Sequence, residues 1–231
     1  GELSGFVAKT KTPGLKGKDH AFRIRGDYNS EAWTSRVHYT EVGEDFNPEV
    51  GFLARNDYRS LEVFTMRRYR PDDWAGIYEL RPHIAYRTFR NFDGYHVTSF
   101  VHADNHWEWK SGLEIHTGMN FFHEGVQTPF EIVDGIEVDA GEYDDHEFAL
   151  VLITDQSAPL SLQLSARYGG IFGGDRVGYE PTIRYRIGEA FTSEFSWNHN
   201  DIDLGPGKEF KVDLARLRLS YSFSPKISIQ A

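Results

Sequence analysis

Histidines are the residues of this chain whose type and spacing most readily suggest chemistry. Four of the ten fall close together in sequence, at His102, His106, His116 and His123. Imidazole nitrogens ligate transition metals, and His102 and His116 are expected to lie on neighbouring strands. No HExxH or comparable ligand spacing is present, however. We therefore interpret these histidines as polar residues of a lumen or a loop, and we predict neither a metal site nor another cofactor.

Clustered and paired carboxylates suggest two further chemistries. The acidic segment from Gly125 to Glu147 could bind Ca²⁺, but its spacing does not match an EF-hand loop, which favours a solvated acidic surface loop. The adjacent pairs Glu44–Asp45 and Asp72–Asp73 suggest glycoside hydrolysis as a second chemistry. That reaction needs two carboxyls about 5–9 Å apart across a cleft. Adjacent residues on a strand point to opposite faces, so these pairs are poorly suited to that role. The sequence therefore assigns no catalytic residue.

Two other motifs have structural explanations. The glycines of "GGIFGGDRVG" are not followed by the helix that a phosphate-binding loop requires, so they indicate tight backbone turns. Tryptophan rings can stack on sugars, but near strand ends they more often anchor a membrane interface. The five tryptophans are Trp33, Trp74, Trp107, Trp109 and Trp197.

The elements that must position these residues are β-strands. Every second residue from Val177 to Ile187 is apolar or aromatic, and this period of two is typical of a strand, since successive side chains point to opposite faces. About thirteen such strands are predicted. One runs from Ile77 to Phe89, another from Tyr95 to His102, and a third between His106 and Phe121, with a tight turn near Ala103 to Asn105.

Charged residues alternate with the apolar ones on several of these strands. If the apolar row faces lipid, the charged row faces a polar lumen, where opposite charges on neighbouring strands pair. Such ladders make an interior wet and selective rather than catalytic. The predicted lumen-facing residues are Glu79, Arg81, Arg87, Glu180, Arg184 and Arg186.

Composition narrows the classes of function. The 231 residues suffice for one large β-domain or two small ones. An aromatic content of 15% is heavy for a soluble domain and fits the aromatic girdles of membrane barrels. No stretch approaches the ~20 consecutive apolar residues of a spanning helix, which excludes a helical membrane protein. The net charge of −10 argues against a nucleic-acid partner, and the absence of cysteine excludes disulfides and thiolate metal sites.

Connection lengths indicate how the strands are joined. Longer connections, such as Lys11 to Asp19 and Val42 to Asp57, mostly alternate with shorter ones, such as Asn29 to Glu31 and Gly188 to Ala190. In an up-and-down meander every second connection lies at the same end, and short turns at one end with long loops at the other are typical of outer-membrane barrels. Strands longer than ten residues, as from Glu209 to Phe223, fit the ~9–11 residues that cross a bilayer.

Several blocks resemble a large bacterial envelope family, namely "NSEAWTSRVHYTEVGEDFNPEVGFLARNDYR", "DNHWEWKSGLEIHTG", "EFALVLITDQSAPLSLQL" and "GGDRVGYEPTIRYR…NDIDL". Its members look like an N-terminal family-nine carbohydrate-binding-like module followed by an outer-membrane barrel domain of unknown function. The resemblance implies that residues 1–231 are part of that barrel domain. The chain begins at Gly1 without a signal-like segment and stops within a strand, so we expect the N-terminal module and one or more closing strands to lie outside it. The family supplies no catalytic residues.

Together these patterns predict an all-β fold, an antiparallel up-and-down transmembrane β-barrel located in the bacterial outer membrane. The expected role is anchoring, or passage linked to carbohydrate binding or uptake, with outer-membrane lipid and a polysaccharide or oligosaccharide as partners. Two alternatives remain open, a soluble all-β carbohydrate-binding module and an envelope-associated glycan hydrolase. Exposed apolar rows would favour the barrel, and rows buried against a second sheet would favour the soluble module.

Overall fold

The computed structural model describes residues 1–15, 17–49, 53 and 55–231, and their regular elements are all β-strands. No helix among these residues is long and apolar enough to cross a membrane. The first seven strands are β1 (Glu2–Lys9), β2 (His20–Asn29), β3 (Trp33–Val42), β4 (Tyr58–Arg67), β5 (Ile77–Arg90), β6 (His96–Trp109) and β7 (Glu114–Val126). The others are β8 (Phe130–Val133), β9 (Ile136–Val138), β10 (Gly141–Ile153), β11 (Leu160–Ile171), β12 (Gly174–Ile187), β13 (Phe191–Asp203), β14 (Glu209–Ser224) and β15 (Ile227–Gln230).

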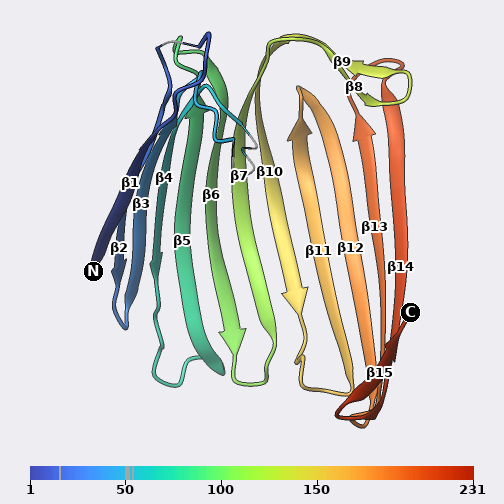
Figure 1. The fold of residues 1–231 in the computed structure, drawn as a ribbon. Coiled ribbons are helices and arrows are strands. Elements are labelled where there is room, and N and C mark those ends of the chain that lie inside the picture. The colour runs from blue at the N-terminus through green and yellow to red at the C-terminus, as the bar shows by residue number, and fades with distance from the viewer. Residues whose placement is uncertain (16, 50–52, 54) are drawn as a thin grey trace. The chain divides into compact units, whose positions relative to one another are not determined.

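Thirteen strands form one sheet in which hydrogen-bonded neighbours follow the chain order from β1 to β15, leaving out β8 and β9, which pair with each other (Figure 1). Every pairing with a defined register is antiparallel. This is the up-and-down meander that the sequence predicts. The predicted all-β antiparallel fold is confirmed.

The connections alternate in length over part of the meander, as expected, but not throughout. At one end of the meander the strands are joined through 10–19, 43–57, 91–95, 127–140, 172–173 and 204–208. At the other end they are joined through 30–32, 68–76, 110–113, 154–159, 188–190 and 225–226. The first set includes the longest connections, 10–19, 43–57 and 127–140, the last of which carries β8 and β9. It also includes the two-residue turn 172–173, whereas 68–76 in the second set has nine residues. The predicted long connections at 11–19 and 42–57 include residue 16 and residues 50–52 and 54, which lie outside the described residues.

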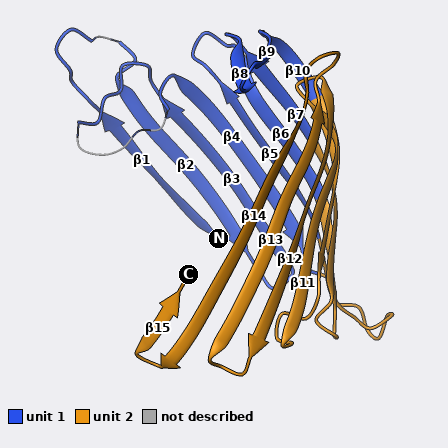
Figure 2. Ribbon diagram, turned by 90° about the vertical axis from the view of Figure 1, so that its right-hand side faces the viewer, with its two compact units in different colours: residues 1–68, 82–103, 121–144 blue, residues 69–81, 104–120, 145–231 orange. Residues whose placement is uncertain are grey.

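The chain divides into two compact units, shown in blue and orange in Figure 2. Unit 1 contains residues 1–68, 82–103 and 121–144, and unit 2 contains residues 69–81, 104–120 and 145–231. Strands β5, β6, β7 and β10 each contribute residues to both units.

In unit 2 the register sorts apolar and polar residues onto opposite faces. Leu162 of β11 lies opposite Ile183 of β12, Ile183 opposite Phe195 of β13, and Phe195 opposite Leu217 of β14. Residues directly opposite one another in antiparallel strands share a face, so these four form one apolar rung. The rung one residue away is polar and consists of Ser161, Arg184, Glu194 and Arg218.

Burial is inverted relative to a water-soluble protein. The apolar rows are exposed, with relative exposures of 43% for Leu162, 43% for Ile183 and 59% for Leu217. Glu147 and Ser161 are the largest fully buried side chains. The buried apolar residues are few among those described: Ala21, Val42, Ile77, Val138 and Ile202. A folded protein in water shows the reverse arrangement, because burial of apolar surface drives its folding.

Unit 1 follows the same alternation. Ile24, Tyr39 and Leu61 are aligned across β2, β3 and β4 on one face. The adjacent polar rung joins Arg25, His38, Glu62 and Arg87 across β2 to β5.

Two predicted boundaries are wrong. No turn occurs near Ala103 to Asn105, because β6 continues without a break to Trp109. The turn lies at 110–113, where the Trp109 N–H donates to the Leu113 carbonyl and Gly112 has a φ of 81°. Asp and Asn are common in turns, but here the pairing of neighbouring strands overrides that preference. The strand predicted to begin at Glu147 instead begins at Gly141, so the acidic segment is partly β-strand.

Candidate functional site: the polar wall of unit 2

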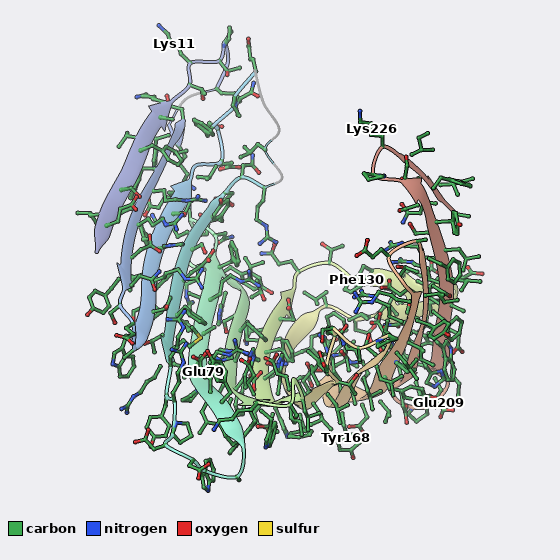
Figure 3. The ribbon with its side chains drawn as sticks, turned by 90° about the horizontal axis from the view of Figure 1, so that it is seen from below. Lys11, Glu79, Phe130, Tyr168, Glu209 and Lys226 are labelled. Carbon is green, nitrogen blue, oxygen red and sulfur yellow. The ribbon has the colours of Figure 1, made fainter. Side chains whose placement is uncertain are left out.

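The polar face of unit 2, which we call the polar wall, begins with an ion-pair cluster around Arg81. Glu79 is 4% exposed and accepts a hydrogen bond of 2.8 Å from Nε of Arg70 (Glu79 is labelled in Figure 3). Arg81, two residues along β5 and therefore on the same face, donates through Nη2 to Oε1 of Glu114 and lies 3.5 Å from Oε2 of Glu108. Three carboxylates thus surround one guanidinium group.

The turn at 110–113 brings Glu108 and Glu114 together. Continuing the register from the hydrogen bond between Trp109 and Leu113 places Glu108 opposite Glu114, and His106 opposite His116. The rings of His106 and His116 are stacked, with centroids 3.5 Å apart and planes 1° from parallel. The hairpin therefore presents two carboxylates and two imidazoles on one face.

A second buried group lies further along the polar wall. Nδ2 of Asn120 in β7 donates to Oε1 of Glu147 in β10 at 2.7 Å, and Nη2 of Arg176 in β12 donates to the other carboxylate oxygen. The side chain of Glu147 is 1% exposed. A buried carboxylate is tolerated only when it is paired and hydrogen-bonded, and this one has both partners.

Strands β12 to β14 continue the polar wall with weaker, more exposed contacts. Arg184 donates to Oε2 of Glu194 at 2.7 Å, and Arg218 lies 3.6 Å from the other oxygen of Glu194. Glu180 accepts a hydrogen bond of 3.0 Å from Nδ2 of Asn198.

A polar hollow of about 320 Å³ lies beside Glu180 and is lined mainly by Arg167, Arg176, Asn198 and Asn200. Gly178 leaves room for the side chain of Asn200, because a Cβ atom there would lie 2.6 Å from Oδ1 of Asn200. The hollow offers guanidinium and amide donors beside a carboxylate, a set of groups that hydrogen-bonds hydroxyl-rich or anionic small molecules.

Arg186 stabilises a turn. Its Nη2 donates to the carbonyl oxygens of Gln156, Ser157 and Ala158 at 2.9, 2.7 and 3.1 Å. In the same turn, hydrogen bonds from the hydroxyl and backbone N–H of Ser157 lower the pKa of Asp155 below its ordinary value, and the charge of Arg186 lowers it further. The sequence pattern alone did not reveal this role.

The predicted lumen-facing residues fall into two groups. Glu79, Arg81, Glu180, Arg184 and Arg186 belong to the polar wall of unit 2. Arg87 belongs to unit 1, opposite Glu62. That these side chains face a lumen stays a prediction.

The four clustered histidines do not form one site. In unit 1, His102 contacts the ring of His83 at 5.1 Å, and His123 stacks on His96 at 3.9 Å and lies 2.8 Å from Asp144. In unit 2, one ligand atom from each of Asp104, His106 and His116 lies within 4.8 Å of the others, so these three residues could hold a metal ion.

The carboxylate pairs remain in connections between strands. Glu44 and Asp45 lie within 43–57, and Asp72 and Asp73 within 68–76. The carboxylates that the fold does bring together, Glu108 and Glu114, both contact Arg81 and belong to the ion-pair network.

Aromatic residues mark the two limits of the apolar face of unit 2. Towards the start of β12 and the end of β13, Tyr179 contacts the rings of Trp197 and His199 at 5.3 and 4.8 Å, and Trp197 donates to Asp213 at 2.8 Å. Beyond them on the same face, Lys211 lies 2.8 Å from Asp201. At the opposite end Tyr221 contacts Phe223 at 4.8 Å.

The other four tryptophans lie at or beside the short-turn ends of strands. Trp33 begins β3, Trp74 lies in 68–76, and Trp107 and Trp109 are near the end of β6. This placement agrees with the predicted position near strand ends, and their anchoring role stays a prediction.

Comparison with solved structures finds distant structural likenesses. The chain is similar to the NanC porin, solved in a rhombohedral crystal form, with 9% sequence identity and a TM-score of 0.38, over 96% of this chain and 98% of that one. No protein-family profile matches the chain, and no curated protein matches it. The resemblance to the envelope family with a carbohydrate-binding-like module therefore stays a prediction.

Proposed function

We propose that this chain is the membrane domain of a bacterial cell-surface protein, an outer-membrane β-barrel whose polar wall lines a water-filled interior. One observation carries the proposal, the inverted burial of unit 2. Its long apolar rows are exposed while carboxylates such as Glu79 and Glu147 are buried and paired. Hydrocarbon is the environment in which such rows are stable without a second protein layer.

The dimensions support a membrane role. The apolar row of β12 extends from Val177 to Ile187, ten residue steps that span about 33 Å at ~3.3 Å per residue. With the tilt of about 40° usual in membrane barrels, that length covers a height of about 25 Å, the thickness of their apolar band. Aromatic side chains towards both limits of the apolar face, Tyr179 and Trp197 at one and Tyr221 and Phe223 at the other, suit the two interfaces of a bilayer.

A membrane-spanning sheet must also have no open edge, because unpaired backbone groups are costly in hydrocarbon. Strands β1 and β15 stand at the ends of the strand order. The proposal therefore includes closure, in which these edges pair with each other or with further strands, so that residues 1–231 belong to one barrel domain.

The role that we favour inside the barrel is passage or binding of small polar solutes, carbohydrates among them. The polar hollow supports it, because its arginine, asparagine and glutamate side chains match the hydrogen-bonding groups of sugars. The carbohydrate part depends on the resemblance to the envelope family, whose members carry a carbohydrate-binding-like module. Anchoring of such a module without passage is the second candidate.

Cysteine labelling tests the membrane proposal directly, because the chain has no native cysteine. Leu162 and Gln163 are neighbours in β11, both exposed and on opposite faces. In the intact protein in bilayers, we expect Gln163→Cys to react with a water-soluble maleimide and Leu162→Cys to react only after the bilayer is dissolved in detergent. Equal labelling of both variants in intact bilayers would overturn the proposal.

Conductance across planar bilayers separates passage from anchoring. If the barrel allows passage, we expect ion conductance that falls when an oligosaccharide is added. In Arg167→Ala, which alters the polar hollow, we expect the extent of this fall in conductance to change. A protein that passes the cysteine test but shows no conductance and no release of entrapped sugars from liposomes is an anchor.

A further inference from the structure

The turn between β6 and β7 creates an unusual histidine pair on the polar wall. His106 and His116 are equidistant from this turn and face each other across the hairpin with stacked, parallel rings. The stack brings the two imidazoles together on one face, and imidazole nitrogens are metal ligands.

A single carboxylate orients both rings. Oε1 of Glu114 lies 2.8 Å from Nε2 of His116 and 3.4 Å from Nδ1 of His106, and Arg81 in turn holds Glu114. With a proton on each of the two nitrogens that face Glu114, an ion would be bound through Nδ1 of His116 and Nε2 of His106, which also faces Oδ2 of Asp104. Histidines that bind metals usually donate their other N–H to a carboxylate in this manner.

Asp104 supplies a third donor. Its Oδ2 lies 3.5 Å from Nε2 of His106, and one ligand atom from each of Asp104, His106 and His116 lies within 4.8 Å of the others. Donor atoms of a tetrahedral site with bonds of about 2.0–2.2 Å stand about 3.3–3.6 Å apart. One edge of the triangle therefore has the required length. Imidazole lone pairs lie in the ring plane, so the two stacked rings have to turn out of their parallel arrangement before both can bind one ion.

The surrounding charge favours a cation. The cluster contains four carboxylates, of Glu79, Asp104, Glu108 and Glu114, and two guanidinium groups, of Arg70 and Arg81. These six groups have a formal charge of −2, which a divalent ion would neutralise. The side chains of His106 and Glu114 are 25% and 22% exposed, so an ion has access from the solvent side.

We propose that Asp104, His106 and His116 bind a divalent transition-metal ion of the Zn²⁺ type, with Glu114 as the residue that positions both histidines. Two imidazoles and a carboxylate are ligands that Zn²⁺ accepts, and a fourth position is left for water or a solute. The sequence-based expectation of no metal site depended on ligand spacing along the chain, whereas these donors converge across a hairpin. The proposal does not depend on whether the barrel conducts.

Metal titration of the intact, tag-free protein in detergent tests this site. After removal of metals with a chelator, Co²⁺ is added as a spectroscopic probe and then displaced with Zn²⁺. We expect saturable binding of one Co²⁺ per chain, with visible absorption bands that disappear as Zn²⁺ competes.

Three variants and one control assign the ligands. His116→Gln and His106→Asn keep an amide donor towards Glu114 but lack the metal-facing nitrogen, so each should weaken Zn²⁺ affinity at least tenfold. Glu114→Gln should weaken it by about 10–100-fold, as expected for a positioning residue. The control, His199→Gln, changes a histidine that contacts Asp213 on the opposite face and should leave the affinity unchanged. Circular dichroism confirms that each variant folds.

Either of two results would overturn the proposal. One is the absence of saturable binding in the micromolar range by the unmodified protein. The other is Zn²⁺ affinity that stays the same in folded His116→Gln and His106→Asn, since the ion would then bind elsewhere.

Discussion

The two faces of strands β11 to β14 differ completely although one backbone layer separates them. On one face Leu162, Ile183, Phe195 and Leu217 form an exposed apolar rung, and one residue along each strand Ser161, Arg184, Glu194 and Arg218 form a polar rung. The apolar rung has no protein layer over it in unit 2, whereas the polar rung is joined by ion pairs. The comparison teaches that the two faces of this sheet are built for different surroundings, one apolar and one polar.

Charge on the apolar face should have the largest effect. Ile183→Arg places a guanidinium group in the middle of the apolar row, which costs about 2–4 kcal/mol at the midplane of a bilayer. Gln163→Arg, on the polar face of the neighbouring strand, should change the free energy of unfolding by less than about 1 kcal/mol. Denaturant unfolding of both variants in lipid vesicles measures the difference. Equal losses in the free energy of unfolding would mean that the two faces have similar surroundings.

Removal of a buried charge on the polar wall should have a smaller effect. Glu147→Gln keeps the shape of the side chain but removes the charge that Arg176 contacts, and a loss of about 1–3 kcal/mol is expected for a buried group that loses its partner. The exposed Glu209→Gln serves as the control (Glu209 is labelled in Figure 3). Equal free energies of unfolding for the two variants would mean that the interior of the polar wall is as well hydrated as its surface.

The smallest predicted effect concerns pH at the turn 154–159. The pKa of Asp155 is lowered by hydrogen bonds from Ser157, so ionised Asp155 stabilises the turn above the ordinary pKa of aspartate. That contribution should be lost as pH falls from about 4 through the lowered pKa. Hydrogen exchange at the Ser157 amide should accelerate over this range relative to a remote turn, and Asp155→Asn should abolish the pH dependence. If the exchange rate at Ser157 relative to that of the remote turn does not change with pH in the unmodified protein, ionised Asp155 does not stabilise this turn.

Period-two patterns and connection lengths were sufficient to predict the meander, as β12 illustrates. The fixed geometry of a strand converts sequence alternation directly into two faces, without knowledge of any partner. The charged residues of the polar wall were predicted from the same alternation, and Glu79, Arg81, Glu180 and Arg184 contact partners on that face.

Cross-strand partners could not be predicted in the same way. The expected turn near Ala103 to Asn105 would have placed His106 and His116 on one strand, ten residues apart, whereas the true turn at 110–113 sets them face to face. A turn displaced by a few residues changes every pairing that follows it. Likewise, the contacts of Arg186 with the carbonyls of 156–158 arise from the shape of a turn that alternation does not describe.

The neighbour-to-neighbour strand order has a consequence for how the chain reaches its folded state. Each strand of the main sheet pairs with the strand next along the chain, apart from the step from β7 to β10 that encloses the small hairpin, so the contacts are short in sequence separation. Chains of this kind can assemble one hairpin at a time, with little entropy lost in closing long loops. The exposed apolar surface of strands such as β11 and β12 need not collapse on itself, provided that each completed hairpin enters lipid as it forms.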